Sequence, residues 1–298
     1  MRRPELKAAG DTDGFILVAV LWILAALAAL ASVYAVYIGN TAMSARLYGH
    51  RIQSEALITA GLELTAFRLL GFDDASRPSS GAFDVQIGGS HIGVDFHSEG
   101  ARIDLNLAQK SLLSGLLAGL GAKPGDADSF ADRIIAWRTK PPPGNQNPEA
   151  GAYKDAGLNY RPRQAPFQNA AELRLVLGLP PELVDAALPF VTVFNGRPEI
   201  DINEAAPEVI AALPHMNPGT AADILKRRDP QNPQAVLGLL GEARTSVAVG
   251  GRKAAWAAIH ITLDTGRRVN ADVVILIVDN GPEPYRVLAW RDDFDGPV

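Results

Sequence analysis

The longest uniform pattern in the sequence is an apolar run close to the N-terminus. Residues 15–38 contain no charged side chain. A helix needs about 20 consecutive apolar residues to cross the hydrocarbon core of a bilayer, so this run is long enough to span a membrane. The apolar stretch of a secretory signal peptide is shorter, about 7–15 residues. Ala29 and Ala31 leave cleavage after the helix open as an alternative, but the length of the run favours a retained membrane helix.

The helical pattern continues beyond the apolar run. Residues of one helix face recur at helical spacing, at Leu57, Gly61, Leu64 and Leu69. No proline occurs between residues 15 and 70. We therefore predict one helix over residues 15–70, loosened or interrupted at Gly39-Asn40. At 1.5 Å per residue it would be roughly 80 Å long, far more than a bilayer requires.

Alternating apolar and polar residues predict strands in two other regions. The alternation at residues 85–87 and 92–96, on either side of Gly88-Gly89, predicts a β-hairpin. The region 256–292 has the same character and predicts about three strands, with a turn at Thr265-Gly266 and a connector at Gly281-Pro282.

The middle of the chain, residues 101 to about 250, predicts short helices separated by proline and glycine. Because strands flank this block, we predict an α+β fold: a long N-terminal helix, a small antiparallel sheet and a large all-α domain inserted into the sheet. The block contains an internal repeat, since ARIDLN at 101–106 and EIDIN at 199–203 each precede a predicted helix. Asn106 and Asn203 are expected to cap those helices.

Charge narrows the possible functions. The chain has 28 Lys and Arg against 33 Asp and Glu, and this balance argues against a general nucleic-acid binder. It has no cysteine, which excludes disulfides, thiolate metal sites and a cysteine nucleophile. Arg2, Arg3 and Lys7 precede the apolar run, so the positive-inside rule places that end in the cytoplasm and the rest outside the inner membrane.

A family resemblance rests first on the N-terminal motif. A short polar leader, Gly14, then Phe15 and a long half-buried helix resemble type IV pilins and the pseudopilins of type II secretion. In that family a prepilin peptidase cuts after the glycine and methylates the new N-terminal Phe, which would be Phe15. The fifth mature position is usually Glu and here is Ala19, a departure that resembles the K-type minor pseudopilins. The leader ends in TDG instead of the family's basic run.

The helical block carries the more specific part of the resemblance. The stretches IDLN, GAY, PFQNAAEL, VLGL and IDINEAAPEVI, together with Tyr160, resemble the K family throughout this block. The resemblance implies a leader at 1–14, a membrane and pseudopilus-core helix at 15–38, the rest of a pilin-like helix and the first strands at 39–100, an inserted α-helical domain at 101–250, and closing strands at 251–298.

The resemblance also implies a function. It predicts a non-enzymatic minor pseudopilin at the pseudopilus tip, initiating assembly for protein export across the outer membrane. The implied partners are other minor pseudopilins, the major pseudopilin, the prepilin peptidase and the inner-membrane assembly platform. The implied location is the inner membrane, with a single span and the C-terminal domain in the periplasm.

Two other functions stay open. The segment 200–228 resembles a helix-hairpin-helix unit, with a hairpin at 215–219 and basic residues at 226–228. A membrane-tethered DNA-binding protein of a competence-type pilus is therefore an alternative. However, Pro218 removes one backbone N–H and the usual glycine pair is reduced to Gly219, so a helical packing unit is favoured. An ordinary single-span periplasmic protein without processing is the other possibility.

The sequence contains few candidates for a catalytic or metal site. His91, His97 and Asp95 share one face of a predicted strand, where solvent-facing histidines are favoured over a metal pair. No nucleophile elbow, phosphate loop or zinc-protease motif occurs, so we expect no enzyme and no cofactor.

Calcium binding needs clustered oxygen ligands. The K family usually carries a D-W-x-D-x-D pattern after the first repeat, whereas the acids are missing around Trp137. Asp292, Asp293 and Asp295 are the remaining weak candidates, with a solvated tail as the favoured interpretation.

Overall fold

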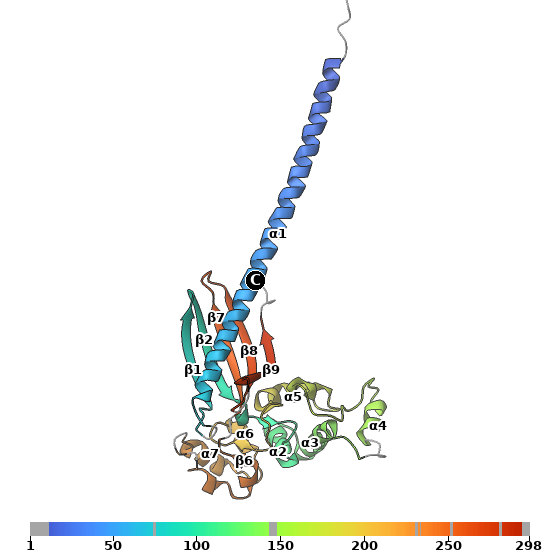
Figure 1. Ribbon diagram of the computed structural model, residues 1–298. Coiled ribbons are helices and arrows are strands. Elements are labelled where there is room, and N and C mark those ends of the chain that lie inside the picture. The colour runs from blue at the N-terminus through green and yellow to red at the C-terminus, as the bar shows by residue number, and fades with distance from the viewer. Residues whose placement is uncertain are drawn as a thin grey trace, which may run out of the picture. The chain divides into compact units, whose positions relative to one another are not determined.

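The computed structural model describes the backbone of residues 12–73, 76–142, 148–229, 232, 234–250, 253–279 and 282–293, and their side chains except at 12–14, 42, 44–47 and 148. The chain divides into two compact units, Met1–Ala56 and Leu57–Val298. Figure 1 labels α1, the strands of the sheet and the helices of the chain.

The first unit is built from one helix. Helix α1 (Thr12–Leu70) begins three residues before Phe15 and contributes its residues up to Ala56 to this unit. The predicted interruption at Gly39-Asn40 is wrong, because α1 is continuous there. A glycine costs a helix only about 1 kcal/mol relative to alanine, and long helical flanks propagate through such a position. The hydroxyl of Thr41 donates to the Tyr37 carbonyl at 2.9 Å and adds a hydrogen bond across this turn.

The second unit contains a five-stranded antiparallel sheet. Its strands are β1 (Ser80–Ile87), β2 (Ser90–Ser98), β7 (Ala254–Thr262), β8 (Arg268–Ile277) and β9 (Tyr285–Asp292), in the order β1-β2-β7-β8-β9. Both predicted turns are confirmed. Gly88 and Gly89 have φ values of 57° and 86°, as the tight turn of this hairpin requires, and Gly266 has φ 81°. Gly281 of the predicted connector lies outside the described residues.

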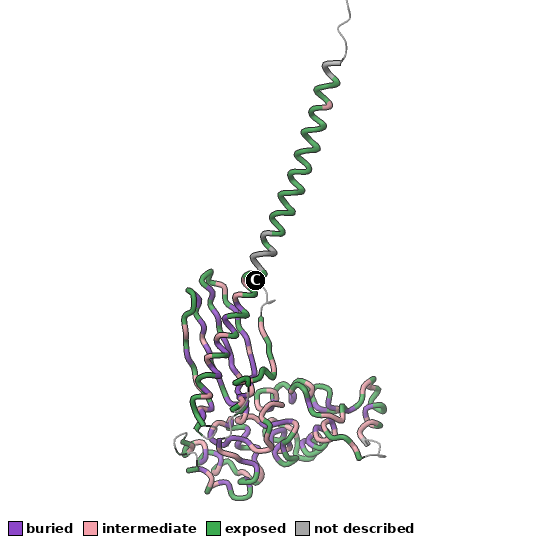
Figure 2. The backbone as a smooth tube through the Cα atoms, in the orientation of Figure 1, coloured by how far each residue is buried: buried purple, intermediate pink, exposed green. Residues whose placement is uncertain are grey.

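The last part of α1, from Leu57 onward, packs on one face of this sheet. The predicted apolar face is confirmed, because Leu57, Gly61 and Leu69 are buried and Leu64 is half-buried. Gly61 permits a close approach: a Cβ built there would lie only 3.3 Å from a methyl group of Ile259. Figure 2 shows the buried residues of the sheet in purple.

A buried arginine fixes the end of α1. The side chain of Arg77, in the loop after α1, is only 1% exposed. Its Nε donates to the carbonyl of Leu69 at 3.0 Å, and its Nη2 pairs with Asp279 at 2.5 Å in the loop after β8. A helix leaves its last carbonyls without partners, and this guanidinium satisfies one of them while tying the helix to the sheet.

A helical block is inserted between β2 and β7, which confirms the predicted α+β fold. Its helices are α2 (Lys110–Gly119), α3 (Pro124–Arg138), α4 (Pro148–Asp155), α5 (Pro181–Ala187), α6 (Pro207–Ala211) and α7 (Pro218–Arg227). Short 3-10 helices join them: η1 (Glu99–Ala101), η2 (Ala170–Leu175), η3 (Leu188–Phe190), η4 (Leu237–Leu239) and η5 (Gly241–Ser246). The block has its own apolar core, separate from the core between α1 and the sheet.

The internal repeat appears as two short parallel strand pairs. Strand β3 (Ile103–Asp104) pairs with β4 (Val191–Thr192), and β5 (Ile200–Asp201) pairs with β6 (Val247–Ala248). The first strand of each pair is followed by two helices, α2 and α3 in one case and α6 and α7 in the other.

The two repeats also share hydrogen bonds. Asp104 Oδ1 accepts from the Asn106 N–H at 2.7 Å, and Asp201 Oδ1 accepts from the Asn203 N–H at 3.1 Å. At the end of the second helix, Arg138 donates to the carbonyl of Ala108 at 2.7 Å and Arg228 to that of Ala205 at 2.9 Å. Each repeat therefore closes its helix pair with an arginine at the equivalent place.

The predicted helix caps at Asn106 and Asn203 are wrong. The N-cap of α2 is Gln109 and that of α6 is Ala206, three residues beyond each asparagine. The Asn106 amide instead donates to the carbonyl of Phe167 at 3.0 Å and accepts from its N–H at 2.6 Å. A long-range backbone partner thus replaces the local capping role.

Candidate interaction surfaces

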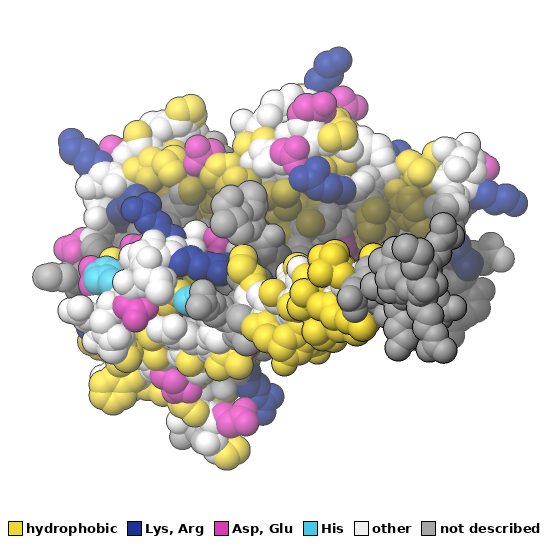
Figure 3. All heavy atoms as spheres, turned by 90° about the horizontal axis from the view of Figure 1, so that it is seen from above, with side chains coloured by type: hydrophobic (Ala, Val, Ile, Leu, Met, Phe, Trp, Pro, Cys, Tyr) yellow, Lys and Arg dark blue, Asp and Glu magenta, His cyan; other side chains and the backbone are white. Residues whose placement is uncertain are grey.

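The first candidate surface is the apolar part of α1. Residues Phe15–Thr41 form one helix that is long and apolar enough to cross a membrane, and none of its residues is buried. Figure 3 shows its hydrophobic side chains as an almost unbroken yellow surface. The hydroxyl of Ser32 donates to the Ala28 carbonyl at 2.8 Å, so this polar group is satisfied within the helix.

The predicted processing residues lie at the start of this surface. Gly14 is within the first turns of α1, and the side chain of Phe15 is 76% exposed. Ala19 is half-buried and places no carboxylate in the apolar surface. The leader residues Arg2, Arg3 and Lys7 lie outside the described residues.

The second candidate surface is the open edge of the sheet at β9. This strand has β8 on one side only and is the terminal strand of the sheet. Val287, Leu288 and Trp290 are exposed, the last at 39%. An exposed apolar edge strand offers free backbone groups and apolar side chains to another chain. Sequence patterning predicted this strand, but not that it would form an edge.

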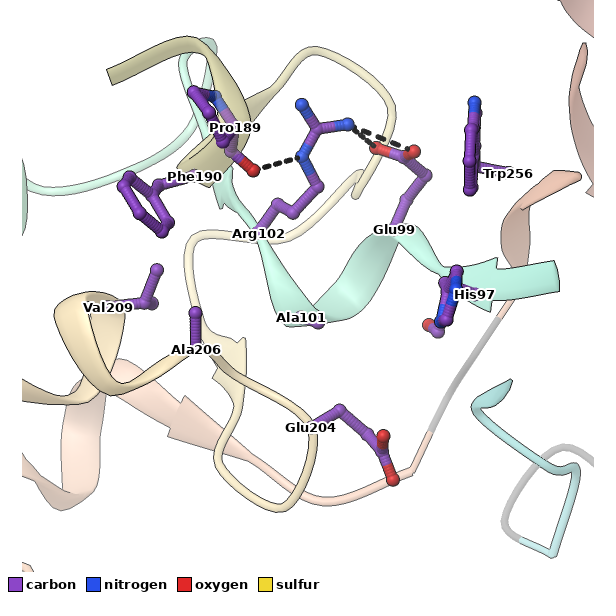
Figure 4. A pocket seen from close by; sticks show the side chains of 11 residues that line it. His97, Glu99, Ala101, Arg102, Pro189, Phe190, Glu204, Ala206, Val209 and Trp256 are labelled. Carbon is purple, nitrogen blue, oxygen red and sulfur yellow. Dashed lines mark hydrogen bonds and ion pairs between the residues drawn. The ribbon is translucent and has the colours of Figure 1, made fainter. Parts of the chain in front are cut away.

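The third candidate surface is a cavity of about 580 Å³ where the inserted block meets the sheet (Figure 4). Glu99 and Arg102, which directly follow β2, line one side, and Trp256 of β7 lines another. The Trp256 ring stacks on His97, with the ring centroids 5.8 Å apart. Sequence reasoning missed this cavity, because its walls come from four separate segments, around residues 97–102, 189–190, 204–209 and 256.

The charged side chains that line this cavity differ in how many partners they have. Glu99 is buried and lies 3.3 and 3.4 Å from Arg102 Nη1. Arg102 is held more firmly by the carbonyls of Leu188 and Pro189, at 2.8 and 3.2 Å. Glu204 also lines the cavity. In the described part of the chain, its carboxylate has no hydrogen-bond or ion-pair partner.

The histidines of β2 face solvent, as predicted. His91, Asp95 and His97 are exposed on one face of the strand. His91 lies 3.3 Å from Asp84, and Asp95 lies 4.0 Å from His260. Among the described residues, no three His, Cys, Asp or Glu side chains are grouped to hold a metal ion.

The acidic residues near the C-terminus bind within the sheet. Asp292 accepts from the Trp290 indole N–H at 2.7 Å, and Asp293 accepts from the backbone and side-chain amides of Asn270 at 2.7 and 2.8 Å. Asp292, the last residue of β9, is half-buried and Asp293 is exposed, so both reach solvent while these hydrogen bonds hold them at the end of the sheet. Asp295 lies outside the described residues.

Arg138 lies in the stretch around Trp137 where the K family usually carries its acidic motif. Arg138 donates to the carbonyls of Leu105 and Ala108. Burial lowers the pKa of Arg138, and burial also raises the pKa of the nearby Asp104 carboxyl, against the opposing effect of hydrogen bonds from Gly196 and Asn106. Two backbone carbonyl oxygens, a type of group that calcium takes as ligand, are engaged here by a guanidinium.

The proposed phosphate-binding hairpin lies between α6 and α7. His215 has φ 56°, and its ring lies 3.1 Å from the Glu242 carboxylate. At the start of α7, the Thr220 N–H donates to the Asn217 side chain at 2.9 Å, so this backbone donor is already satisfied. Arg228 points inward to Ala205. The Thr220 N–H and the Arg228 guanidinium therefore already have partners within the chain.

Comparison with known proteins gives three similarities. The family described as type II secretion system (T2SS), protein K, matches residues 98–196. A type II secretion system protein K from Pseudomonas aeruginosa is 32% identical over 115 residues, which are 38% of this chain and 34% of that protein. The match therefore spans about a third of that relative's length.

The third similarity is structural. A chain in the crystal structure of the GspK-GspI-GspJ complex from the type 2 secretion system of enterotoxigenic Escherichia coli superposes with a TM-score of 0.58. It is 18% identical, and the superposition covers 80% of this chain and 94% of that one. At this identity the similarity demonstrates a shared fold.

Proposed function

We propose that the whole chain is a minor pseudopilin with a structural, non-enzymatic role, because residues 98–196 match the type II secretion system protein K family. The observation that carries this proposal is the division of α1. Residues 15–41 are apolar and exposed, whereas the helix from Leu57 onward is buried against a sheet. A subunit that leaves a membrane to enter a fibre needs both properties in one helix.

The proposed location is the inner membrane, with a single span. Arg2, Arg3 and Lys7 would keep the N-terminus in the cytoplasm, and the sheet with its inserted block would lie in the periplasm.

The proposed partners are other minor pseudopilins and the major pseudopilin, with assembly through the inner-membrane platform. The superposed protein is crystallised in a complex named for GspK, GspI and GspJ, which supports an equivalent complex for this chain. The exposed edge of β9 and the apolar surface of α1 are two surfaces through which such subunits could meet.

The proposed position is the pseudopilus tip, where the chain would initiate assembly for export across the outer membrane. A charge within an apolar fibre core requires a partner from a neighbouring subunit. Ala19 presents no such charge, which suits a subunit with no other subunit above it. The bulk of the inserted block would also obstruct the addition of a further subunit.

The proposed maturation is cleavage between Gly14 and Phe15 by a prepilin peptidase, followed by methylation of the Phe15 amine. The test is co-expression of the full chain with such a peptidase, followed by mass analysis of the N-terminus. We expect a product that lacks the first 14 residues and begins with methylated Phe15.

Matched variants make that test specific. Gly14→Leu should block cleavage, whereas Gly10→Leu, the same change elsewhere in the leader, should leave it intact. An uncut wild-type chain, or a cut within or after the apolar helix, would overturn the proposal.

The competing DNA-binding function has its own test. A gel-shift assay with the full chain in non-ionic detergent should show no complex with duplex DNA. A retarded complex that weakens steeply with added salt would favour the DNA-binding alternative.

A further inference from the structure

The cavity beside Trp256 combines features that usually mark a binding site. It is about 580 Å³ in volume, within the range of small-ligand pockets. Most of its wall is apolar and includes Ala101, Phe190, Ala206 and Val209. Glu204 and the buried Glu99 add acidic groups at opposite sides of this wall (Figure 4).

The charges favour a cationic occupant. Among the described residues, Arg102 is the one arginine or lysine in the lining, and its shortest hydrogen bond goes to the carbonyl of Leu188. Its contacts with Glu99, at 3.3 and 3.4 Å, are longer than usual for a charge-assisted hydrogen bond. Within the described part of the chain, Glu204 has no cationic partner at all. The cavity therefore keeps acceptor capacity that its own cation does not use.

The aromatic wall points to the same chemistry. The Trp256 ring lines this cavity and also a neighbouring cavity of about 480 Å³, with Glu99 and Arg102 as the other shared walls. An indole face attracts a cation, and Trp is the strongest of the aromatic side chains in this respect. Apolar walls suit the methylene stem of such a ligand, while its charged head remains at the acidic side.

We propose that this cavity is a receptor for a long basic side chain, arginine or lysine, presented by a partner protein. The methylene stem would lie against Phe190 and Val209, and the cationic head would meet Trp256 and Glu204. In an assembly the contact would anchor the partner, and in that respect it rests on the proposed function. The binding of a basic side chain by the cavity does not depend on the proposed function, because it can be measured without any partner subunit.

The test uses the full chain in non-ionic detergent with 5-fluorotryptophan in place of its four tryptophans. Fluorine NMR then reports on each tryptophan, and the Trp256 signal is assigned from its loss in Trp256→Phe. The probes are N-acetyl-arginine methylamide, its uncharged citrulline analogue, and the corresponding glutamate and tyrosine amides.

We expect the arginine probe to shift the Trp256 signal saturably and to leave Trp137 unchanged. The citrulline probe should bind roughly two- to fivefold more weakly, as expected for the loss of one cation–π contact at a partly exposed site. Glu204→Gln should weaken arginine binding by roughly two- to fivefold. Glu208→Gln, the same change on the adjacent helix outside the cavity lining, should not.

Three results would overturn the proposal: no shift of Trp256, equal binding of the citrulline probe, or stronger binding of the glutamate or tyrosine probe. An unchanged affinity in Glu204→Gln would remove that residue's assigned role and overturn the proposed geometry. None of these outcomes would affect the pseudopilin proposal, which is tested separately by cleavage at Gly14.

Discussion

The two parts of α1 have the same backbone but opposite surroundings. In residues 15–41 no side chain is buried, although the segment is almost wholly apolar. From Leu57 onward, apolar side chains on one face are buried against the sheet, and charged residues such as Glu63 and Arg68 lie on the exposed face. Two kinds of apolar pattern therefore coexist in one helix: one that is apolar all around for a lipid or protein environment, and one that is amphipathic for a folded core.

The largest contrast should come from shortening one leucine in each part. Leu62→Ala removes a side chain that is 1% exposed in the core between helix and sheet, and should lower the free energy of unfolding by about 2–5 kcal/mol. Leu27→Ala changes an exposed position outside that core and should leave unfolding of the second unit unchanged. Thermal unfolding of the full chain in detergent, followed by near-UV circular dichroism, measures both. Equal destabilisation by the two changes would contradict the contrast.

A similar contrast is expected for two arginines. Arg77→Gln removes the buried guanidinium that binds the Leu69 carbonyl and Asp279, and should cost about 1.5–3 kcal/mol of stability. Arg51→Gln alters an exposed pair with Glu55 and should cost less than about 0.5 kcal/mol. Urea unfolding of both variants gives their free energies of unfolding. An Arg77→Gln variant as stable as the wild type would contradict the stabilising role of the Arg77 contacts.

Two glycines of α1 allow a third comparison. A Cβ at Gly61 would lie 3.3–3.4 Å from methyl groups of Ile259, Ile92 and Val94, so Gly61→Leu should destabilise the chain by about 1–3 kcal/mol. A Cβ at Gly39 would meet nothing within 4 Å, so Gly39→Leu should cost no stability and should raise helix propensity. Thermal melts distinguish the two; a stable Gly61→Leu protein would show that the helix does not pack this closely on the sheet.

The smallest effect should come from pH. Burial, followed by the neighbouring Glu63 carboxylate, raises the pKa of Tyr285 to about 12, and the Tyr285 hydroxyl donates to Glu63 at 3.1 Å. Since the pKa in the unfolded chain is about 10, the stabilising contribution is complete below pH 10 and is lost as the pH rises through 12. Melting temperatures between pH 9 and 12 should fall, and Tyr285→Phe should make this fall shallower. An identical pH profile for the variant would contradict the link between α1 and β9.

Sequence patterning was reliable where the neighbours that matter are local. The helix over residues 15–70, the Gly88-Gly89 hairpin and the C-terminal strands all follow from periodicity and turn residues. The caps at Asn106 and Asn203 were wrong because local propensity was overridden. The amide of Asn106 instead binds the backbone of Phe167, 61 positions away.

The candidate sites show the same limit. The apolar helix could be identified from composition alone, because a lipid environment imposes a length and a polarity on the sequence. The cavity could not be identified, since Glu99, Glu204 and Trp256 lie in three distant segments that only the fold brings together. The exposed edge at β9 also depends on strand order, which alternation of residues does not encode.

We propose that residues 15–41 serve first as a membrane anchor and later as part of a fibre core. The most direct measurement places a photo-crosslinking amino acid at Leu27 in cells with and without the other pseudopilins. We expect adducts with lipid alone when those proteins are absent, and additional adducts with their apolar helices when they are present. The same photo-crosslinking amino acid placed at Phe67, which is exposed on the packed part of α1, should give no lipid adduct. Lipid adducts alone at Leu27 in both strains would contradict the claim.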